Sequence, residues 1–240
     1  MKGLTAIITG AGSGIGRAIA IALAKEGVNI ALVGGKREEN LKESKLLVQN
    51  EGVECEYFGG DLTDDKTLIN CFNKAVERFG GVDILINNAG LTHNSLLKDT
   101  ERQTFDNMMA VNVRVPYLLT KTALPELKKS KRASIVNIAS VVAHSGYAWQ
   151  SAYSASKHAL LGFTKALSAE VYKDDIRVHV VSPGGVFTDM VKVSRPDLNP
   201  DGMIMPEDVA DAVLFLIKNR TNAVVDEVII HRSGKQPFLV

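Results

Sequence analysis

Short apolar runs recur along the chain and alternate with stretches of helical periodicity. Runs such as Val82–Ile86 and Ser134–Ile138 are apolar on most successive residues, which is typical of parallel strands covered on both faces. The pattern predicts strands over residues 4–9, 28–34, 53–58, 83–87, 133–138, 176–181 and 226–231. Because helical patterns separate these strands, we expect an α/β fold: a seven-stranded, mostly parallel, doubly wound sheet with helices on both faces.

Several helix boundaries can also be predicted. A helical pattern runs from Ile15 to Lys25, and the Thr100–Gln103 segment has the spacing of a capping box. Pro206 suits the first turn of another helix. The helix expected over residues 154–172 is apolar or small on more than one side. A second apolar face needs a partner beyond the sheet.

Composition narrows the classes of function. With 240 residues and no linker-like tract, we interpret residues 1–240 as one domain. The formal net charge of +1 gives no reason to expect nucleic acid or an acidic membrane as a partner. The two cysteines, Cys55 and Cys71, and the five histidines lack metal spacing, so we predict no catalytic metal. The absence of a signal-like start and of long apolar runs favours a cytoplasmic enzyme of small molecules.

The clearest chemical motif near the start is a glycine-rich turn. Thr9-Gly10-Ala11-Gly12-Ser13-Gly14-Ile15-Gly16 follows the first predicted strand and precedes the first predicted helix. Such a turn directs backbone N–H groups and the positive end of the helix dipole at a phosphate. The spacing is T-G-x-x-x-G-x-G rather than G-x-G-x-x-G. Taken alone, the turn is also compatible with a purely structural connection.

A tyrosine and a lysine stand four residues apart at Tyr153 and Lys157. Residues at this spacing are neighbours on one helix face. A phenol ionises near pH ~10 in water, and a cation within ~4–6 Å lowers its pKa. We therefore expect Lys157 to lower the Tyr153 pKa and to make the phenol a proton donor or acceptor.

Six motifs in the same order make the chain similar to the short-chain dehydrogenase/reductase family over nearly its whole length. They are the glycine turn, Asp61 in Gly60–Thr63, Asn87–Gly90, Asn112, Ser140 with the Tyr153/Lys157 pair, and Pro183–Thr188. The resemblance implies a Rossmann-type fold and a catalytic tetrad of Asn112, Ser140, Tyr153 and Lys157. It also implies a nicotinamide cofactor held by Gly10, Ser13, Gly14, Ile15, Gly16, Asp61, Leu62, Asn88, Ala89, Gly90, Tyr153, Lys157, Pro183, Gly184, Val186 and Thr188.

The resemblance assigns a role to each tetrad member. Ser140 is expected to orient the substrate oxygen and Tyr153 to exchange its proton as hydride transfer proceeds. Lys157 is expected to bond the nicotinamide ribose as well, and Asn112 to hold a water that links Lys157 to solvent. Structural alternatives stay open: Asp61 could cap a helix starting near Thr63, and Asn112 could be a satisfied polar residue within a helix.

Cofactor choice is expected to depend on the end of the second strand. Gly34-Gly35-Lys36-Arg37 has no carboxylate to bind a ribose 2′-hydroxyl, and its two cations suit a 2′-phosphate. We therefore predict that NADP(H) is favoured over NAD(H), although Ser13 stands where many NADP-preferring relatives have a basic residue. The alternative for Lys36 and Arg37 is a solvated helix start, where cations oppose the dipole.

The substrate is much less readable. Pocket candidates are His144, Tyr147, Trp149, Gln150 and a short substrate loop near residues 187–205. We interpret His144 as a lining or loop residue rather than an acid/base group. The basic run Lys128, Lys129, Lys131 and Arg132 could dock an acyl carrier protein or could simply be a solvated helix end.

The sequence favours a carbonyl or secondary alcohol substrate, with 3-oxoacyl-carrier reduction and sugar or polyol oxidation as narrower options. The segment Val225–Arg232 departs from the V-D-G-G-like ending of many members, which weakens the assignment to acyl carrier reductases. A non-catalytic NADP(H) sensor or scaffold and a sugar-nucleotide epimerase are the alternatives. The apolar second face and the resemblance together predict a homotetramer, or a homodimer, through helices near residues 101–128 and 154–172.

Overall fold

A single parallel sheet of seven strands forms the centre of the molecule in the computed structural model. The structure describes residues 1–35, 37–189, 191 and 201–235. The strands are β1 (Thr5–Thr9), β2 (Asn29–Gly34), β3 (Cys55–Gly59), β4 (Ile84–Asn87), β5 (Ser134–Ile138), β6 (Arg177–Pro183) and β7 (Glu227–Ile230). Their order is β3-β2-β1-β4-β5-β6-β7, and every neighbouring pair is parallel. The expected doubly wound sheet is confirmed, and each strand lies within about two residues of its predicted range.

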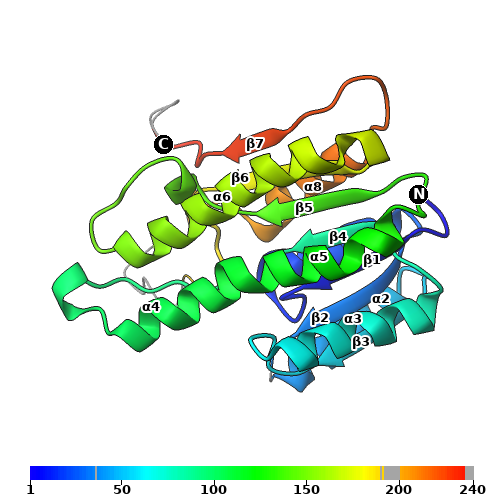
Figure 1. The fold of residues 1–240 in the computed structure, drawn as a ribbon, viewed down its shortest axis with the longest axis horizontal. Helices are drawn as coiled ribbons and strands as arrows, with labels where there is room; N and C mark the ends of the chain where they lie inside the picture. Colours follow the sequence, from blue (N-terminus) through cyan, green and yellow to red (C-terminus); the bar gives the residue numbers. More distant parts are fainter. Residues whose placement is uncertain (36, 190, 192–200, 236–240) are drawn as a thin grey trace.

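Helices cover both faces of this sheet (Figure 1). They are α1 (Gly14–Lys25), α2 (Glu38–Gln49), α3 (Asp65–Phe79), α4 (Arg102–Met109), α5 (Val115–Leu127), α6 (Ser151–Val171) and α8 (Pro206–Lys218). Short turns are η1 (Leu97–Asp99), the π-helical η2 (Ala110–Arg114), η3 (Val141–Ala143) and η4 (Tyr172–Asp174). One apolar core packs α1, α2 and α8 on the sheet, and a second packs α3, α5 and α6 on the opposite face.

A chain of buried polar side chains connects the two central strands to the helices above them. Asn87 on β4 donates from Nδ2 to Asn137 Oδ1 at 2.8 Å and to Thr120 Oγ1 at 3.1 Å. Asn137 on β5 in turn donates to Thr164 Oγ1 at 2.8 Å. Because an unpaired polar group here would lose its water without compensation, these bonds fix the positions of α5 and α6 on the sheet.

Two predicted helix starts have different outcomes. Pro206 is the first residue of α8, as predicted. The capping box at Thr100 is wrong: α4 begins at Arg102 after Glu101, and no side chain caps it. The Thr100 hydroxyl instead donates to the Leu96 carbonyl at 3.0 Å, so it closes the preceding turn η1.

The sheet register brings the carboxyl ends of the strands to one edge. Thr9 pairs with Val33, Asn87 with Asn137, and Pro183 with Ile230. Strand order reverses between β1 and β4, where an open parallel sheet forms its crevice. The residues that directly follow these strands therefore face one common space.

Candidate active site

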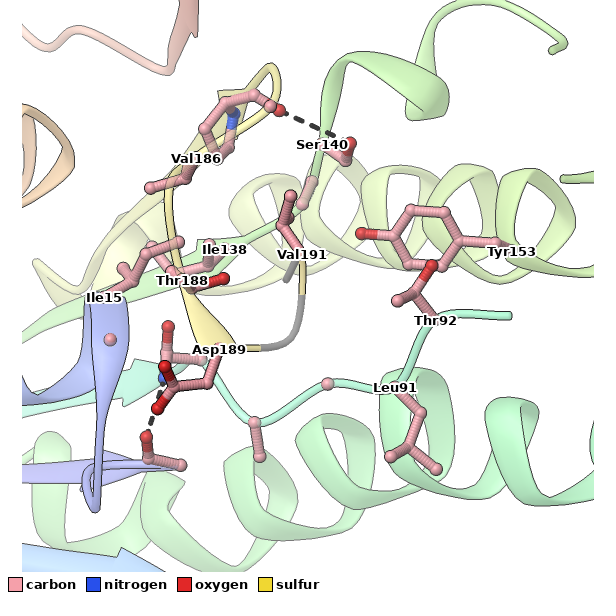
Figure 2. A pocket seen from close by; sticks show the side chains of 18 of the residues that line it. Ile15, Leu91, Thr92, Ile138, Ser140, Tyr153, Val186, Thr188, Asp189 and Val191 are labelled. Carbon is pink, nitrogen blue, oxygen red and sulfur yellow. Dashed lines mark hydrogen bonds between the residues drawn. The ribbon is translucent and has the colours of Figure 1, made fainter. Parts of the chain in front are cut away.

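A cavity of about 820 Å³ lies at the carboxyl edge of the sheet. Its walls come from the segments that follow β1, β2, β4, β5, β6 and β7, together with the start of α6. Figure 2 shows Ile15 and Thr188 on one side of this space, Leu91 and Thr92 on another, and the Tyr153 hydroxyl directed into it. The volume lies within the range of about 300–1,000 Å³ that is usual for cofactor and substrate sites.

The glycine turn forms the wall next to β1. Gly10 and Gly14 have φ angles of 66° and 52°, a region that side chains with a Cβ rarely adopt. Helix α1 starts at Gly14, and its N-cap Ser13 makes no side-chain capping bond. The first amides of α1 are thus left without a side-chain acceptor, at the end where the dipole favours an anion. Gly10, Ser13, Gly14 and Ile15 all line the cavity, whereas Gly16 packs beneath the turn.

Asn88 braces this turn from β4. Its Nδ2 donates to the Thr9 carbonyl at 2.9 Å and to the Gly10 carbonyl at 3.2 Å. The Thr9 hydroxyl oxygen accepts from the amides of Asn88 and Ala89, each at 3.0 Å. Asn88, Ala89 and Gly90 also line the cavity, so this segment combines a structural role with a place in the wall.

Arg17 also braces the glycine turn, a role that the sequence pattern did not indicate. Its guanidinium donates to the Gly12 carbonyl at 2.6 Å and to Ser44 Oγ at 2.9 Å, and it pairs with Glu43 at 2.7 Å. These contacts connect the glycine turn to α2. An arginine one turn into a helix is usually a solvated residue, and only the tertiary fold places α2 against it.

Ser140 and Tyr153 lie at the opposite end of the cavity. Ser140 follows β5 and donates to the Pro183 carbonyl at 3.3 Å, the dashed contact in Figure 2. A side-chain hydrogen bond also links Ser140 to Tyr153. Lys157 is buried one turn further along α6 and donates from Nζ to the Ile138 carbonyl at 2.8 Å. Its Nζ is 5.9 Å from the centre of the Tyr153 ring.

The expectation that Lys157 lowers the Tyr153 pKa is wrong. Burial raises the pKa of Tyr153 to about 12, and the hydrogen bond with Ser140 opposes that rise only in part. Burial also lowers the pKa of Lys157 to about 8. The Lys157 ammonium bonds to the Ile138 carbonyl, and desolvation dominates the pKa of both groups.

Asn112 lies within the π-helical turn η2 and is buried. Its Oδ1 accepts from the Leu91 amide at 2.7 Å, and its Nδ2 donates to the Leu91 carbonyl and to Ser156 Oγ, each at 2.9 Å. The side chain thus holds the loop after β4 against α6. A Cβ added to Gly90 would lie 3.4 Å from Asn112 Oδ1 and 3.7 Å from Lys157 Nζ, so both groups border one glycine.

The segment after β6 closes the cavity, and the segment after β3 lies outside it. Pro183, Gly184, Val186 and Thr188 all line the space, and Thr188 approaches Gly14 closely. Asp61 and Leu62 are not among the lining residues. Asp61 Oδ1 accepts from the amide and hydroxyl of Thr63, at 3.0 and 2.7 Å.

The alternative that Asp61 caps a helix is wrong, because α3 begins at Asp65 and Asp64 accepts from the Thr67 amide as its cap.

At the end of β2, Gly34, Gly35 and Arg37 line the cavity, and Lys36 lies outside the described residues. Arg37 is the N-cap residue of α2, whose first turn holds Glu38 and Glu39. Arg37 therefore precedes the first turn of α2 rather than lying within it, which corrects that part of the expectation for this residue.

The candidates for substrate contact divide into two groups. Tyr147 and Gln150 line the cavity, whereas Trp149 is exposed on the outside with a φ of 71°. His144 turns away from the cavity: its Nε2 lies 3.1 Å from Ser182 Oγ and 2.9 Å from Glu227 Oε1. Of the predicted substrate loop, residues 190 and 192–200 lie outside the described residues.

The basic run at the end of α5 lies far from this cavity. Lys128 pairs with Asp174 at 2.9 Å, Lys129 with Glu126 at 2.6 Å, and Arg132 donates to the Lys218 carbonyl at 3.2 Å. These residues directly precede β5 and so occupy the amino edge of the sheet (Figure 1). They are the solvated helix end of the simpler interpretation and cannot border the active-site mouth.

Three basic residues of the cavity wall were not predicted as site residues. His231, Arg232 and Lys235 follow β7 and line the same space. Ligands bind beyond the carboxyl ends of parallel strands, and this rule applies to the last strand as well. The rule could therefore have identified these three residues from the sequence. Within the described residues, no three His, Cys, Asp or Glu side chains are grouped to hold a metal ion. No described helix combines the length and apolarity of a membrane span.

The model of the short chain dehydrogenase family matches residues 4–199. Among curated proteins, the chain is 35% identical to the uncharacterized oxidoreductase YhxC of Bacillus subtilis, over 98% of this chain and 85% of that protein. It is 33% identical to the 3-oxoacyl-[acyl-carrier-protein] reductase FabG of Thermotoga maritima, over 95% and 96% of the two chains.

Two solved structures are similar over nearly their whole length. An alcohol dehydrogenase of Thermococcus sibiricus in complex with 5-hydroxy-NADP has a TM-score of 0.88 at 29% identity, covering 98% of both chains. A short chain dehydrogenase of Mycobacterium paratuberculosis bound to NAD has a TM-score of 0.87 at 28% identity, over 95% and 96%. With this sheet order, this cavity and these matches, the chain belongs to the short-chain dehydrogenase/reductase family of oxidoreductases.

Proposed function

We propose that the protein is an NADP(H)-dependent oxidoreductase that interconverts a carbonyl and a secondary alcohol, with residues 1–240 as one catalytic domain. The observation that carries this proposal is the Tyr153 hydroxyl, which faces the same cavity as the glycine turn (Figure 2). The bound nicotinamide would supply the hydride. The protein must then bind both partners and handle one proton on the substrate oxygen.

The residues present fit a dinucleotide. The uncapped start of α1 and the turn at Gly10 and Gly14 offer backbone amides for the pyrophosphate. Ala89 and Gly90 on one side, and Val186 and Thr188 on the other, border the length of the cavity beyond the turn. Larger side chains at this edge of the sheet would leave no room for a dinucleotide, whereas the glycines leave the space open.

Tyr153 is the proposed general acid and base. With a pKa raised to about 12, the phenol is protonated at neutral pH and can donate a proton in the direction of carbonyl reduction. Alcohol oxidation requires the tyrosinate, and Lys157 is the cation positioned to stabilise it once its ammonium leaves the Ile138 carbonyl. Ser140 orients the substrate oxygen, and Asn112 holds the neighbouring loop and connects Lys157 to solvent through water.

The preference for NADP(H) over NAD(H) rests on charges at the end of β2. Arg37 lines the cavity there, with Gly34 and Gly35 in place of a carboxylate. The carboxylate that follows in sequence, Glu38, accepts from the Tyr57 hydroxyl at 2.8 Å and pairs with Lys42 at 3.2 Å. The Lys42 ammonium offsets part of its charge, so Glu38 repels a 2′-phosphate less than an unpaired carboxylate would. The solved relatives include a complex with 5-hydroxy-NADP and a complex with NAD, so the proposed preference rests on this chain's own residues.

Self-association through α5 and α6 is part of the proposal, as a homotetramer or a homodimer. Tyr117 on α5 is 54% exposed, and its ring is tilted against Phe163 of α6, with ring centres 5.4 Å apart. Tyr117 thus continues the apolar packing of Phe163 to the surface, where a second copy of the chain would cover it. We propose a cytoplasmic location for the assembly, in accord with its small-molecule chemistry.

The experiment is NADPH oxidation across ketones, aldehydes, oxoacyl thioesters and sugars, for the parent, Tyr153→Phe and Tyr172→Phe. Tyr172 is the matched control, because its side chain is exposed at the far end of α6. We expect Tyr153→Phe to abolish turnover while NADPH affinity stays within a few-fold, and Tyr172→Phe to resemble the parent. Equal activity in Tyr153→Phe would refute the assignment. If the parent binds NADPH tightly but turns over no substrate, the alternative function of a non-catalytic NADP(H) sensor would be favoured.

A further inference from the structure

The last strand delivers basic side chains to the catalytic cavity. His231, Arg232 and Lys235 follow β7 and line the space that also holds Ser140 and Tyr153. Figure 1 shows β7 at the border of the sheet, ending at the same edge as β5. Arg232 is half-buried and Lys235 is exposed. Among the residues that the structure describes, none forms an ion pair with either side chain.

The cavity is positively charged although the whole chain is nearly neutral. Its described lining contains four cations, Arg37, Lys157, Arg232 and Lys235, against one carboxylate, Asp189. The formal net charge of the chain is only +1. A recess with one sign of charge and low-dielectric walls concentrates its field and attracts ligands of the opposite sign.

The cations lie at two separate ends of the cavity. Four strand spacings, or roughly 19 Å, separate β1, where the glycine turn begins, from β7. Arg37 is on the far side of β1, after β2. A dinucleotide anchored at the glycine turn therefore places its phosphates at the end of the cavity next to β1. Arg232 and Lys235 lie at the opposite end, next to β7.

Arg232 lies against the segment that adjoins the catalytic residues. A Cβ added to Gly185 would be 3.9 Å from Arg232 Nε and 4.0 Å from Cζ, so the guanidinium covers a bare stretch of backbone. The Gly184 amide donates to the Ile230 carbonyl at 2.9 Å, which fixes the end of β7 beside this segment. Pro183, one residue earlier, accepts from Ser140.

We propose that the substrate carries an anionic oxygen group, a carboxylate or a phosphate, and that Arg232 binds this group. The reacting carbonyl or hydroxyl of the substrate then faces Ser140 and Tyr153. Lys235 adds a second positive charge at the same end. A guanidinium binds two oxygens of such a group through parallel N–H···O bonds and so orients it as well as attracts it. This inference rests on the proposed oxidoreductase function and narrows its substrate class to charged oxo or hydroxy compounds.

The test compares pairs of substrates in which one member carries the anionic group and the other is neutral. The first pair is 3-oxobutanoate and its methyl ester, and the second is dihydroxyacetone phosphate and dihydroxyacetone. Each is assayed with NADPH on the parent, Arg232→Leu, Arg232→Lys and the control Arg132→Leu. The Arg132 guanidinium donates to the Lys218 carbonyl at the amino edge of the sheet, away from the cavity. Circular dichroism and NADPH titration of every variant check the fold and the cofactor site.

For the charged member of the matching pair, Arg232→Leu should lose about 10- to 100-fold in kcat/KM, the usual effect of a lost hydrogen bond between ionised groups. The neutral member should be a poor substrate for all four proteins, with little change between them. Arg232→Lys should recover part of the loss, because it restores the charge without the planar fork. The pair that responds distinguishes a carboxylate from a phosphate. Arg132→Leu should match the parent.

The inference is overturned if the parent prefers the neutral members, or if Arg232→Leu affects both members equally. A loss of NADPH affinity in Arg232→Leu would assign the side chain to the cofactor and also overturn it. If the parent turns over no carbonyl compound, the proposed function fails instead. In that case, acetate or phosphate should still change the fluorescence of NADPH bound to the parent, but not of NADPH bound to Arg232→Leu. If neither anion changes the fluorescence of the parent complex, the inference is refuted independently of the proposed function.

Discussion

Gly16 and Gly162 both lie in helices, yet alanine at these two positions should change stability in opposite directions. Alanine is favoured over glycine by about 1 kcal/mol within a helix, because glycine loses more backbone entropy on folding. A Cβ on Gly162 of α6 would meet nothing within 4 Å. A Cβ on Gly16 of α1 would lie 2.5 Å from Asn88 Nδ2, 2.9 Å from the Gly10 carbonyl carbon and closer still to the Gly10 oxygen.

The expected magnitudes follow from these contacts. Gly162→Ala should gain up to about 1 kcal/mol in free energy of unfolding. In Gly16→Ala the turn must shift, because its backbone cannot rotate out of the way as a side chain could. Overpacking of this kind costs about 1–3 kcal/mol, which exceeds or cancels the helix gain, so the net change should be a loss of up to about 2 kcal/mol. The two variants should thus differ by about 1–3 kcal/mol, or roughly 2–12 °C in melting temperature for a chain of this size.

The assay is urea or thermal unfolding of both variants beside the parent, without cofactor, followed by NADPH titration. Gly16→Ala should also bind NADPH more weakly, because Gly10 would shift. Gly10 belongs to the glycine turn, which lines the cavity and is proposed to bind the pyrophosphate. Gly162→Ala should bind it as the parent does. If Gly16→Ala were as stable as Gly162→Ala and bound NADPH normally, the close packing of α1 under the glycine turn would be refuted.

Three further predictions address charge, cofactor choice and assembly. The folded pKa of Lys157, about 8, is below its ordinary value of 10.5, so the folded state binds fewer protons between these pH values. The resulting penalty on folding begins below pH 10.5 and is fully present below pH 8. Relative to Lys157→Met, the free energy of unfolding of the parent should therefore rise by up to about 3 kcal/mol between pH 7 and pH 10.5, as measured by urea denaturation; a flat difference would contradict the buried cation. Replacing both Lys36 and Arg37 by alanine should raise the KM for NADPH and leave that for NADH unchanged, and an unaltered preference would refute the 2′-phosphate site. The parent should sediment as a dimer or tetramer at micromolar concentration, and Tyr117→Glu with Phe163→Glu should yield monomers; a monomeric parent would overturn the proposed interface.

The sheet was predictable because its strands are buried on both faces. Continuous apolar runs such as Ser134–Ile138 have few other structures available, so strand positions agree within about two residues. The local signal at Thr100 failed because a threonine hydroxyl can close a preceding turn as readily as cap a helix. Propensity alone does not distinguish those two bonds.

A place in the cavity wall was predictable where a sequence motif determines the backbone, as at Gly10 and Tyr153. The direction in which a side chain points was not predictable, because it depends on the partners that the tertiary fold places beside it. His144 turns towards Ser182 and Glu227, which lie 38 and 83 residues further along the chain. Arg232 was missed for the same reason, since its position against Gly185 follows from the pairing of β6 with β7.

The strand order has a consequence for how the protein is made. β1 pairs on one side with β2, the next strand along the chain, and on the other with β4, whose first residue is Ile84. In a growing chain, β1 therefore has one edge unpaired until more than seventy further residues have been synthesised. The glycine turn and the segment after β4 are synthesised before Tyr153, and Arg232 follows later still. Since the N-terminal parts of a chain fold first during synthesis, the nascent protein should acquire its cofactor turn well before its catalytic end. Stalled chains of increasing length, probed for protection of β1 against proteolysis, would show the centre of the sheet closing before any activity is present.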